Sequence, residues 1–258
     1  MNVLKHQWHK LFFIISLLAC TSAYADLIEI VKKIKPSVVG VGTLEEIRRP
    51  PAQLLGTGFA VGTGEYIITN AHVIPEILDA DKEEKLVVFV GIGKNAKVVE
   101  VSLIDRDRVH DLALLKFKSG HLPPMKLGYM KDVEEGESIA FTGFPIGAVL
   151  GLYPVTSHGI VSAITPIVIP QDSTKTLNAV LIKRLRNPFK VLQLDATAYP
   201  GNSGSALYDA KTGRVIGVIN MVFVKKSKEA VLSDPSGITF AIPVTYIREI
   251  LMRNKIPF

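Results

Sequence analysis

The stretch Tyr199-Pro200-Gly201-Asn202-Ser203-Gly204-Ser205, in the C-terminal half of the chain, sets a serine between glycines. A tight turn of this kind can present the serine hydroxyl and aim backbone N–H groups at one point, where a developing oxyanion would be held. Gly201 has no Cβ to obstruct the unusual backbone angles that such a turn needs. Because the same residues also form ordinary turns, the stretch indicates a nucleophile only if a base and an orienting acid lie elsewhere in the chain.

A candidate base and a candidate acid each lie beside an apolar strand. His72 follows one such strand, whose end would hold a general base rigidly. Asp111 directly precedes the apolar run Leu112-Ala113-Leu114-Leu115, so its carboxylate could orient an imidazole and stabilise the imidazolium. The neighbouring groups of similar chemistry are the acids Asp105 and Asp107, neither of which leads directly into such a strand, and His110.

Short apolar segments bounded by Gly, Pro, Asn and Asp recur along the chain and predict an all-β barrel or sandwich. A linker at 121–124 separates two sets of these segments, since its two prolines would stop a strand ladder. A short amphipathic helix is expected over 26–35, an exposed loop over 45–53, and a closing helix over 243–253. The expected strands are 38–41, 58–61, 66–69, 86–90, 98–104 and 112–117, then 138–142, 159–164, 191–194, 206–208, 215–221 and 239–242.

In combination, these segments resemble the trypsin-like serine peptidases, and most closely their HtrA (Deg) branch. The similarity runs in the family's order from about residue 26 to residue 250. The matching segments are Gly56-Thr57-Gly58-Phe59, Thr69-Asn70-Ala71-His72-Val73, Asp111-Leu112-Ala113-Leu114-Leu115-Lys116, Gly143-Phe144-Pro145, Gly159-Ile160-Val161-Ser162, Gly201-Asn202-Ser203-Gly204 and Phe240-Ala241-Ile242-Pro243.

The resemblance implies a chymotrypsin-like double β-barrel with the active site in the cleft between the barrels. The protease domain would span 26–258, with the first six-stranded barrel at about 36–122, the second at about 125–242 and a C-terminal helix at 243–254. His72 and Asp111 would come from the first barrel and Ser203 from the second, and the N–H groups of Gly201 and Ser203 would bind the oxyanion.

The same resemblance implies a serine endopeptidase that hydrolyses peptide bonds through an acyl-enzyme, in protein quality control of the cell envelope. Its partners would be polypeptide substrates and, by family analogy, further copies of the chain in a homotrimer. No metal or organic cofactor is implied. The alternative is a non-catalytic protein of the same fold that works as a chaperone or docking protein, and the intact set of His72, Asp111 and Ser203 argues against it.

The sequence departs from the family pattern at several positions. PDZ domains usually follow the protease in this family, and none is expected here before Phe258. Ser205 stands where the family usually has a second glycine after the nucleophile, which bears on the shape of the adjoining pocket. Thr197 occupies the position at which an acid selects basic substrates in trypsin-type enzymes. A small or medium apolar residue is therefore expected before the scissile bond, in a pocket lined by Ala198, Met221 and Val222.

An α/β-hydrolase is excluded by the order of the residues. That fold needs Gly-x-Ser-x-Gly and a histidine after the serine. Here Ser205 replaces the last glycine, and the final histidine, His158, precedes Ser203. The segment Gly91-Ile92-Gly93-Lys94 is too short for a phosphate-binding loop, and no pair of histidines has the spacing of a metal site.

The N-terminal residues 1–25 predict a secretory signal peptide, and hence export to the periplasm or the medium. A basic start, the apolar run 11–19 and the small-x-small site Ala23-Tyr24-Ala25 fit this pattern. The alternative is a lipoprotein signal that acylates Cys20, the only cysteine. Cleavage after Ala25 would remove two of the 30 Lys and Arg residues and none of the 24 acids, leaving a formal charge of +4. This charge falls short of that expected of a nucleic-acid binder.

A basic interval lies between Thr165 and Lys190, where Asp172 is the one acid. A connection of this length is usually functional or disordered. Two interpretations stay open: a solvated surface insertion, or a peripheral contact with an acidic membrane or polypeptide that would recruit and gate the enzyme.

Overall fold

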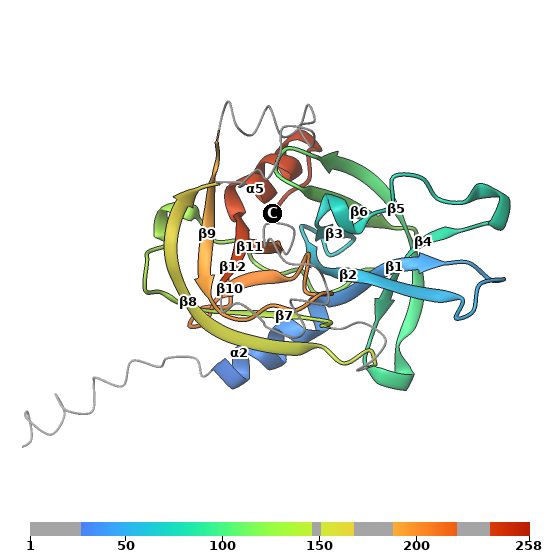
Figure 1. Ribbon diagram of the computed structural model, residues 1–258, viewed down its shortest axis with the longest axis horizontal. Coiled ribbons are helices and arrows are strands. Elements are labelled where there is room, and N and C mark those ends of the chain that lie inside the picture. The colour runs from blue at the N-terminus through green and yellow to red at the C-terminus, as the bar shows by residue number, and fades with distance from the viewer. Residues whose placement is uncertain (1–26, 146–150, 168–187, 221–237) are drawn as a thin grey trace, which may run out of the picture.

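The computed structural model describes residues 27–145, 151–167, 188–220 and 238–258 (Figure 1). The expected signal peptide, Cys20 and most of the basic interval lie outside these residues, as do Met221 and Val222. In the part of the chain that is described, no helix has the length and apolar character needed to cross a membrane.

The strands form two closed barrels of six antiparallel strands each. The first barrel has the order β1-β2-β3-β6-β5-β4 and the second β10-β11-β12-β9-β8-β7, and the two lie side by side in Figure 1. The expectation of an all-β double barrel with short helices at each end is confirmed. The strands are β1 (Val38–Leu44), β2 (Ala52–Val61), β3 (Tyr66–Thr69), β4 (Lys85–Val90), β5 (Lys97–Asp107), β6 (Leu112–Phe117), β7 (Ser138–Gly143), β8 (Val155–Pro166), β9 (Lys190–Asp195), β10 (Ala206–Asp209), β11 (Val215–Asn220) and β12 (Ile238–Pro243).

Several strands are longer than the sequence pattern predicts. The loop expected over 45–53 is shorter, because β2 begins at Ala52, which pairs with Leu44 of β1. Arg48 fixes this connection: its guanidinium donates to the carbonyl oxygens of Thr43 and Pro51. The strand β8 begins at Val155 rather than at 159, and its polar residues gave no apolar run by which to recognise its start.

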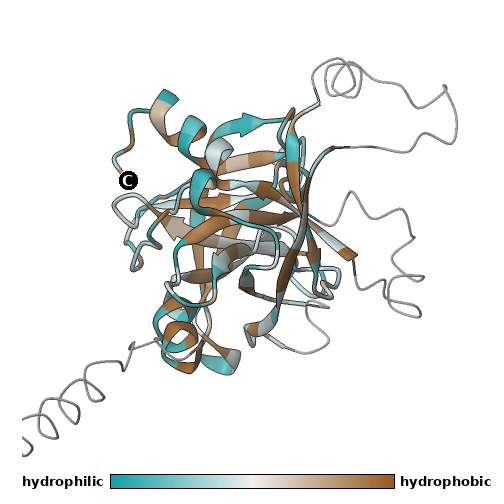
Figure 2. Cartoon of the chain, turned by 90° about the vertical axis from the view of Figure 1, so that its left-hand side faces the viewer, coloured by the Kyte–Doolittle hydropathy of each residue, from teal (hydrophilic) through white to brown (hydrophobic). Residues whose placement is uncertain are grey.

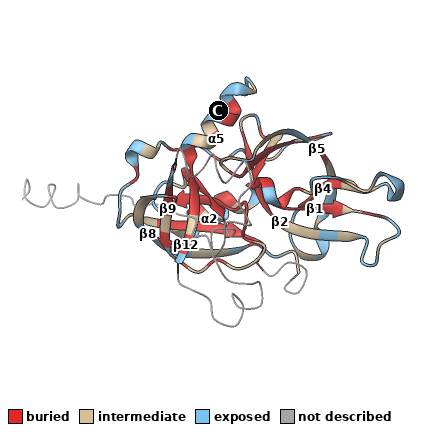
Figure 3. Ribbon diagram, turned by 45° about the horizontal axis from the view of Figure 1, so that its top comes forward, coloured by how far each residue is buried: buried red, intermediate tan, exposed pale blue. Residues whose placement is uncertain are grey.

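Alternation along the strands divides the apolar side chains among three cores. Successive side chains of a strand point to opposite faces, so Ile67 and Leu115 lie inside the first barrel while Ile68 and Leu114 face the second. The second barrel has its own interior core. The residues that join the barrels include Phe59, Leu112, Phe144 and Tyr208, each almost fully buried. Figures 2 and 3 show the hydrophobic and buried residues concentrated in the strands of both barrels.

Both terminal helices are short and pack on this shared core. The helix α2 (Leu27–Ile34) buries Ile30 and Ile34, and a 3-10 turn containing Pro36 follows it. The helix α5 (Val244–Arg253) begins directly after Pro243 and buries one side, formed by Val244, Ile247, Ile250 and Leu251.

We expect Glu137→Gln to change how stability depends on pH. Burial and the nearby carboxylate of Asp209 raise the pKa of Glu137 from its ordinary 4.5 to about 7. Between these values the folded protein holds a proton that the unfolded chain has released, so the free energy of unfolding falls as the pH rises through this window. The variant lacks this titration and should melt at a higher temperature than the wild type at about pH 8, and at a similar one near pH 4.5. Circular dichroism melts measure this; the same difference at both pH values would contradict it.

Candidate active site

His72 lies in a 3-10 turn, Ala71–Val73, directly after β3. The strand β3 pairs with β6, and Thr69 lies opposite Ala113. This pairing brings the end of β3 next to Asp111, at the start of β6. Two hydrogen bonds fix the turn there, since Asn70 Nδ2 and Ala71 N both donate to the carbonyl oxygen of Asp111, at 3.0 and 3.1 Å.

The carboxylate of Asp111 holds His72 by two contacts. Oδ1 accepts from the backbone N–H of His72 at 2.9 Å, and Oδ2 lies 2.6 Å from His72 Nδ1. A third donor comes from the second barrel: Asn220 Nδ2, at the end of β11, lies 2.6 Å from Oδ2. Asp111 is only 6% exposed and adopts a left-handed backbone with φ of 56°. A carboxylate so placed keeps the Nδ1 proton on His72 and leaves Nε2 free to accept another.

The two alternative acids have other partners. Asp105 accepts from Arg253 Nε at 2.5 Å and from Asn254 Nδ2 at 2.6 Å. Asp107 lies 2.8 Å from Nδ1 of His110. Neither has a contact with His72 in the described part of the chain.

Ser203 lies on a turn that leaves two amide groups open. Gly201 has a φ of 102°, a value that favours glycine, and Asn202 N donates to the carbonyl of Tyr199 at 2.9 Å. On either side of Asn202, the N–H groups of Gly201 and Ser203 donate to no acceptor among the residues described. Two unpaired N–H groups two residues apart in one tight turn can serve as the donors of an oxyanion hole.

The first barrel fixes this turn through Thr57 of β2. Its N–H donates to the carbonyl of Ser203 at 2.9 Å, and its hydroxyl donates to the carbonyl of Gly201 at 2.7 Å. The adjacent Gly56 lies between Val73 and Ser203, because a Cβ built on it would be 2.7 Å from Val73 Cγ2 and 3.0 Å from Ser203 O. Ser203 therefore lies beside the segment that carries His72. Among the described residues no hydrogen bond joins its hydroxyl to His72, and such bonds often tighten only when substrate binds.

Ser205 is accommodated by a glycine in the facing strand. Its side chain is fully buried, and a Cβ on Gly143 of β7 would lie only 2.1 Å from Ser205 Oγ. The same Cβ would lie 2.9 Å from Asn202 Oδ1. Within the described ranges, neither Ser205 Oγ nor Asn202 Oδ1 has a hydrogen-bond partner. The side chain of Ser205 thus occupies space that the lack of a Cβ on Gly143 of β7 leaves open.

Of the residues expected to line the specificity pocket, Ala198 lies in the described part of the chain. Ala198 is buried, and its N–H donates to Thr239 Oγ1 on β12, which in turn donates to the carbonyl of Ala196. Thr197 is half-buried.

The sequence reasoning missed Asn220 and the role of Thr57. Asn220 is fully buried at the end of the apolar strand β11. A buried polar side chain destabilises the fold unless it has a hydrogen-bond partner. An asparagine at the end of an apolar strand was therefore the one feature of the sequence that could have indicated such a partner.

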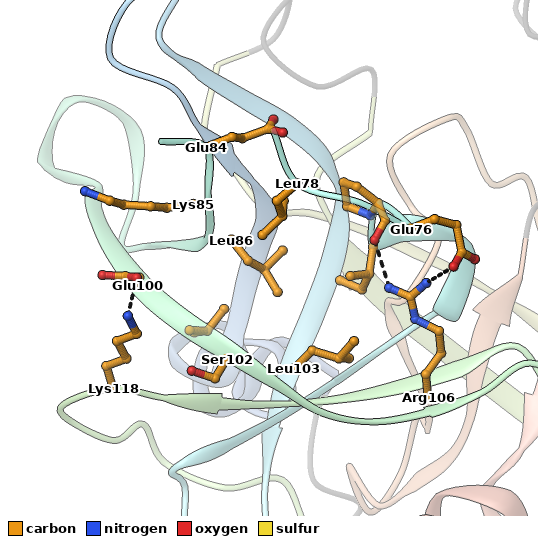
Figure 4. A pocket seen from close by; sticks show the side chains of 13 residues that line it. Glu76, Leu78, Glu84, Lys85, Leu86, Glu100, Ser102, Leu103, Arg106 and Lys118 are labelled. Carbon is orange, nitrogen blue, oxygen red and sulfur yellow. Dashed lines mark hydrogen bonds and ion pairs between the residues drawn. The ribbon is translucent and has the colours of Figure 1, made fainter. Parts of the chain in front are cut away.

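Other possible sites lie away from this one. A cavity of about 400 Å³ on the first barrel is lined by residues that include Ile74, Glu76, Leu86, Glu100 and Arg106, and by neither His72, Asp111 nor Ser203 (Figure 4). Within the described ranges, no group of three or more His, Cys, Asp or Glu residues could hold a metal ion.

Substitution of Asn220 tests the contact between the barrels. Asn220→Ala removes one donor to a buried carboxylate, and we expect the free energy of unfolding to fall by about 1.5–3 kcal/mol, the range for hydrogen bonds to charged groups. Asn220→Asp should cost more at neutral pH, because it places a second negative charge beside Asp111. Urea unfolding measures both. If the aspartate variant is as stable as the alanine variant, the side chain does not face the Asp111 charge in solution.

Comparison with known proteins bears on the family and the fold of the chain. The family model for the trypsin-like peptidase domain matches residues 56–218. A probable periplasmic serine endoprotease, DegP-like, from Halomonas elongata is 32% identical over 190 residues, which cover 74% of this chain and 33% of that protein. A serine protease, HtrA-like, from Staphylococcus epidermidis is 33% identical over 192 residues, covering 74% of this chain and 28% of that protein.

The chain thus spans about a third of the length of these curated relatives. Among solved structures, the HtrA-type protease AlgW with tripeptide matches with a TM-score of 0.62 and 26% identity, covering 88% of this chain and 62% of that one. The barrels and the family model agree: the chain belongs to the trypsin-like peptidase family, and the relatives named above, which it resembles, are HtrA-type and DegP-like proteases.

Proposed function

We propose that the chain is a serine endopeptidase in which Ser203 is the nucleophile, His72 the general base and Asp111 the orienting acid. The observation that carries the proposal is the 2.6 Å contact between His72 Nδ1 and the buried carboxylate of Asp111. A buried carboxylate paired with an imidazole at the end of a strand, next to a serine on a glycine turn, is the arrangement that activates a hydroxyl.

The reaction would proceed through two tetrahedral intermediates. His72 Nε2 takes the proton of Ser203 Oγ as that oxygen attacks the peptide carbonyl carbon, and the carbonyl oxygen becomes an anion held by the N–H groups of Gly201 and Ser203. The C–N bond then breaks, and the leaving amine receives its proton from His72. Water then attacks the ester carbon as His72 takes its proton, which gives the second tetrahedral intermediate. The bond between this carbon and Ser203 Oγ breaks, His72 returns the proton to Oγ, and the acid is released. These steps require no metal or organic cofactor.

The substrate class, the compartment and the assembly of the protein follow from the family and from the sequence rather than from the geometry of the site. The family acts on polypeptides, and we infer polypeptide substrates for this chain. Relatives named periplasmic and the predicted signal peptide at 1–25 support export and a role in protein quality control of the envelope. A homotrimer and recruitment to an acidic surface through 165–190 stay predictions.

A non-catalytic chaperone or docking protein is the second candidate. The observation that favours it is the missing hydrogen bond between Ser203 and His72 among the described residues. A fluorophosphonate probe distinguishes the two, because only an assembled triad and oxyanion hole are labelled quickly. Rapid labelling of Ser203 supports the peptidase, whereas no labelling under conditions that label trypsin supports the alternative.

Ser203→Ala should abolish peptide hydrolysis and leave the thermal midpoint nearly unchanged. The hydroxyl makes no hydrogen bond within the described residues, so its removal costs the fold little. Cleavage of unfolded casein and a melting curve measure the two effects. A variant that still cleaves casein at a comparable rate would assign the nucleophile to another residue.

Asp111→Asn should lower kcat by about 10⁴-fold, because the amide stabilises the wrong tautomer of the imidazole. Because asparagine has nearly the shape of aspartate, we expect kcat to fall far more than the midpoint of unfolding does. Asp105→Asn is the matched control, since Asp105 contacts Arg253 and Asn254 instead of His72. A loss below about tenfold for Asp111→Asn would transfer the orienting role to a different acid.

A further inference from the structure

A second histidine–aspartate pair lies immediately before Asp111. His110 Nδ1 lies 2.8 Å from Oδ2 of Asp107. The other oxygen of Asp107 accepts from the backbone N–H groups of Val109 and His110, both at 3.0 Å. The carboxylate thus closes the turn between β5 and β6. Arg253 Nη1, at the end of α5, also donates to Asp107 Oδ2, at 3.4 Å.

The imidazole of His110 is inserted between elements that belong to other parts of the fold. It stacks on Tyr246 of α5, with ring centroids 3.8 Å apart and an interplanar angle of 14°. It also meets the edge of Phe189, just before β9 of the second barrel, at 4.9 Å. In Figure 1, α5 lies between β9 and the β5–β6 side of the first barrel. The ring therefore joins the first barrel to α5 and to the second barrel.

The residue that follows His110 is Asp111. Asp111 has a left-handed backbone, which is unfavourable for a non-glycine residue and persists only where its surroundings enforce it. On one side Asn70 and Ala71 hold its carbonyl. On the other side the chain is held by the turn of Asp107 and the ring of His110.

We propose that His110 is a positioning residue for catalysis: its ring, packed against Tyr246 and Phe189 in a cluster of three mutually contacting rings, fixes the main chain of Asp111 so that its carboxylate meets His72. The inference rests on the proposed function of the triad. We attribute the positioning of Asp111 to the packing of the His110 ring rather than to its hydrogen bond with Asp107. The backbone N–H groups of Val109 and His110 already close the turn on Asp107 without the side chain of His110.

Three variants separate the ring from its hydrogen bond. His110→Ala removes both, His110→Asn keeps a donor for Asp107, and His110→Phe keeps the stacked ring. We expect kcat for a peptide substrate to fall about 10- to 100-fold in the alanine and asparagine variants, the cost of a displacement of about 1 Å, with KM little changed. The phenylalanine variant should recover most of kcat. His121→Ala is the control, because His121 is exposed and should leave kcat unchanged.

A spectroscopic readout is independent of turnover. In ¹⁵N-histidine-labelled protein, the Nδ1–H proton of His72 should resonate far downfield because it is held by a short hydrogen bond. We expect this resonance to be lost or broadened by exchange in His110→Ala, and to be retained in His110→Phe and His121→Ala. Urea unfolding identifies conditions in which every variant is folded.

Unchanged kcat together with an unchanged resonance in His110→Ala would overturn the proposal. So would a rise in KM at constant kcat, or a phenylalanine variant as slow as the alanine one. If the wild type neither hydrolyses peptides nor reacts with a fluorophosphonate, the proposed function fails by itself. The resonance of His72 then still decides whether His110 positions Asp111.

Discussion

The buried carboxylate of Asp111 is the constraint on which the candidate site depends. A carboxylate removed from water destabilises the fold unless donors satisfy it. Here the donors come from both barrels, since His72 approaches from the turn after β3 and Asn220 from the end of β11. The His72–Asp111 pair is therefore fully satisfied only when the barrels are docked, and the site is a property of the interface rather than of either barrel.

The apolar core between the barrels supplies the stabilisation that this polar cluster needs. Full burial of a large apolar side chain contributes about 1.5–3 kcal/mol, and the interface includes Phe59, Leu112, Phe144 and Ile242, all at most 1% exposed. Leu112 directly follows Asp111. Alternation along β6 turns Leu112 and Leu114 toward the second barrel. Asp111 lies just before this strand with a left-handed backbone, and its carboxylate accepts hydrogen bonds from His72 of the first barrel and Asn220 of the second.

Features of the fold that depend on residues close together in the sequence could be predicted, and contacts between residues far apart in the sequence could not. The apolar run 112–115, the strand before His72 and the glycine turn at Ser203 are local patterns, so the barrels and the three candidate residues could be predicted. Asn220 could not, because its partner is set by the docking of two barrels. The position of His110 in the sequence shows only that it precedes Asp111. No local pattern predicts that its ring packs against Tyr246 and Phe189, which lie far along the chain.

In the part of the chain that the structure describes, several buried polar atoms without a hydrogen-bond partner, and the strained backbone of Asp111, lie close to the candidate residues. Of the five buried side-chain atoms without a partner among the described residues, three belong to Asn70, Asn202 and Ser205, in the two segments that carry His72 and Ser203. Each unpaired atom costs about 1–3 kcal/mol, and the left-handed Asp111 adds strain. Closed barrels can tolerate this, because β2, β3, β6 and β7 are each paired on both sides and hold the ends of the loops in place. Local costs of this kind are expected at functional sites, where the surrounding structure has to hold an unfavourable arrangement in place. Thr57, which holds the carbonyls of Gly201 and Ser203, is one of the residues that does so here.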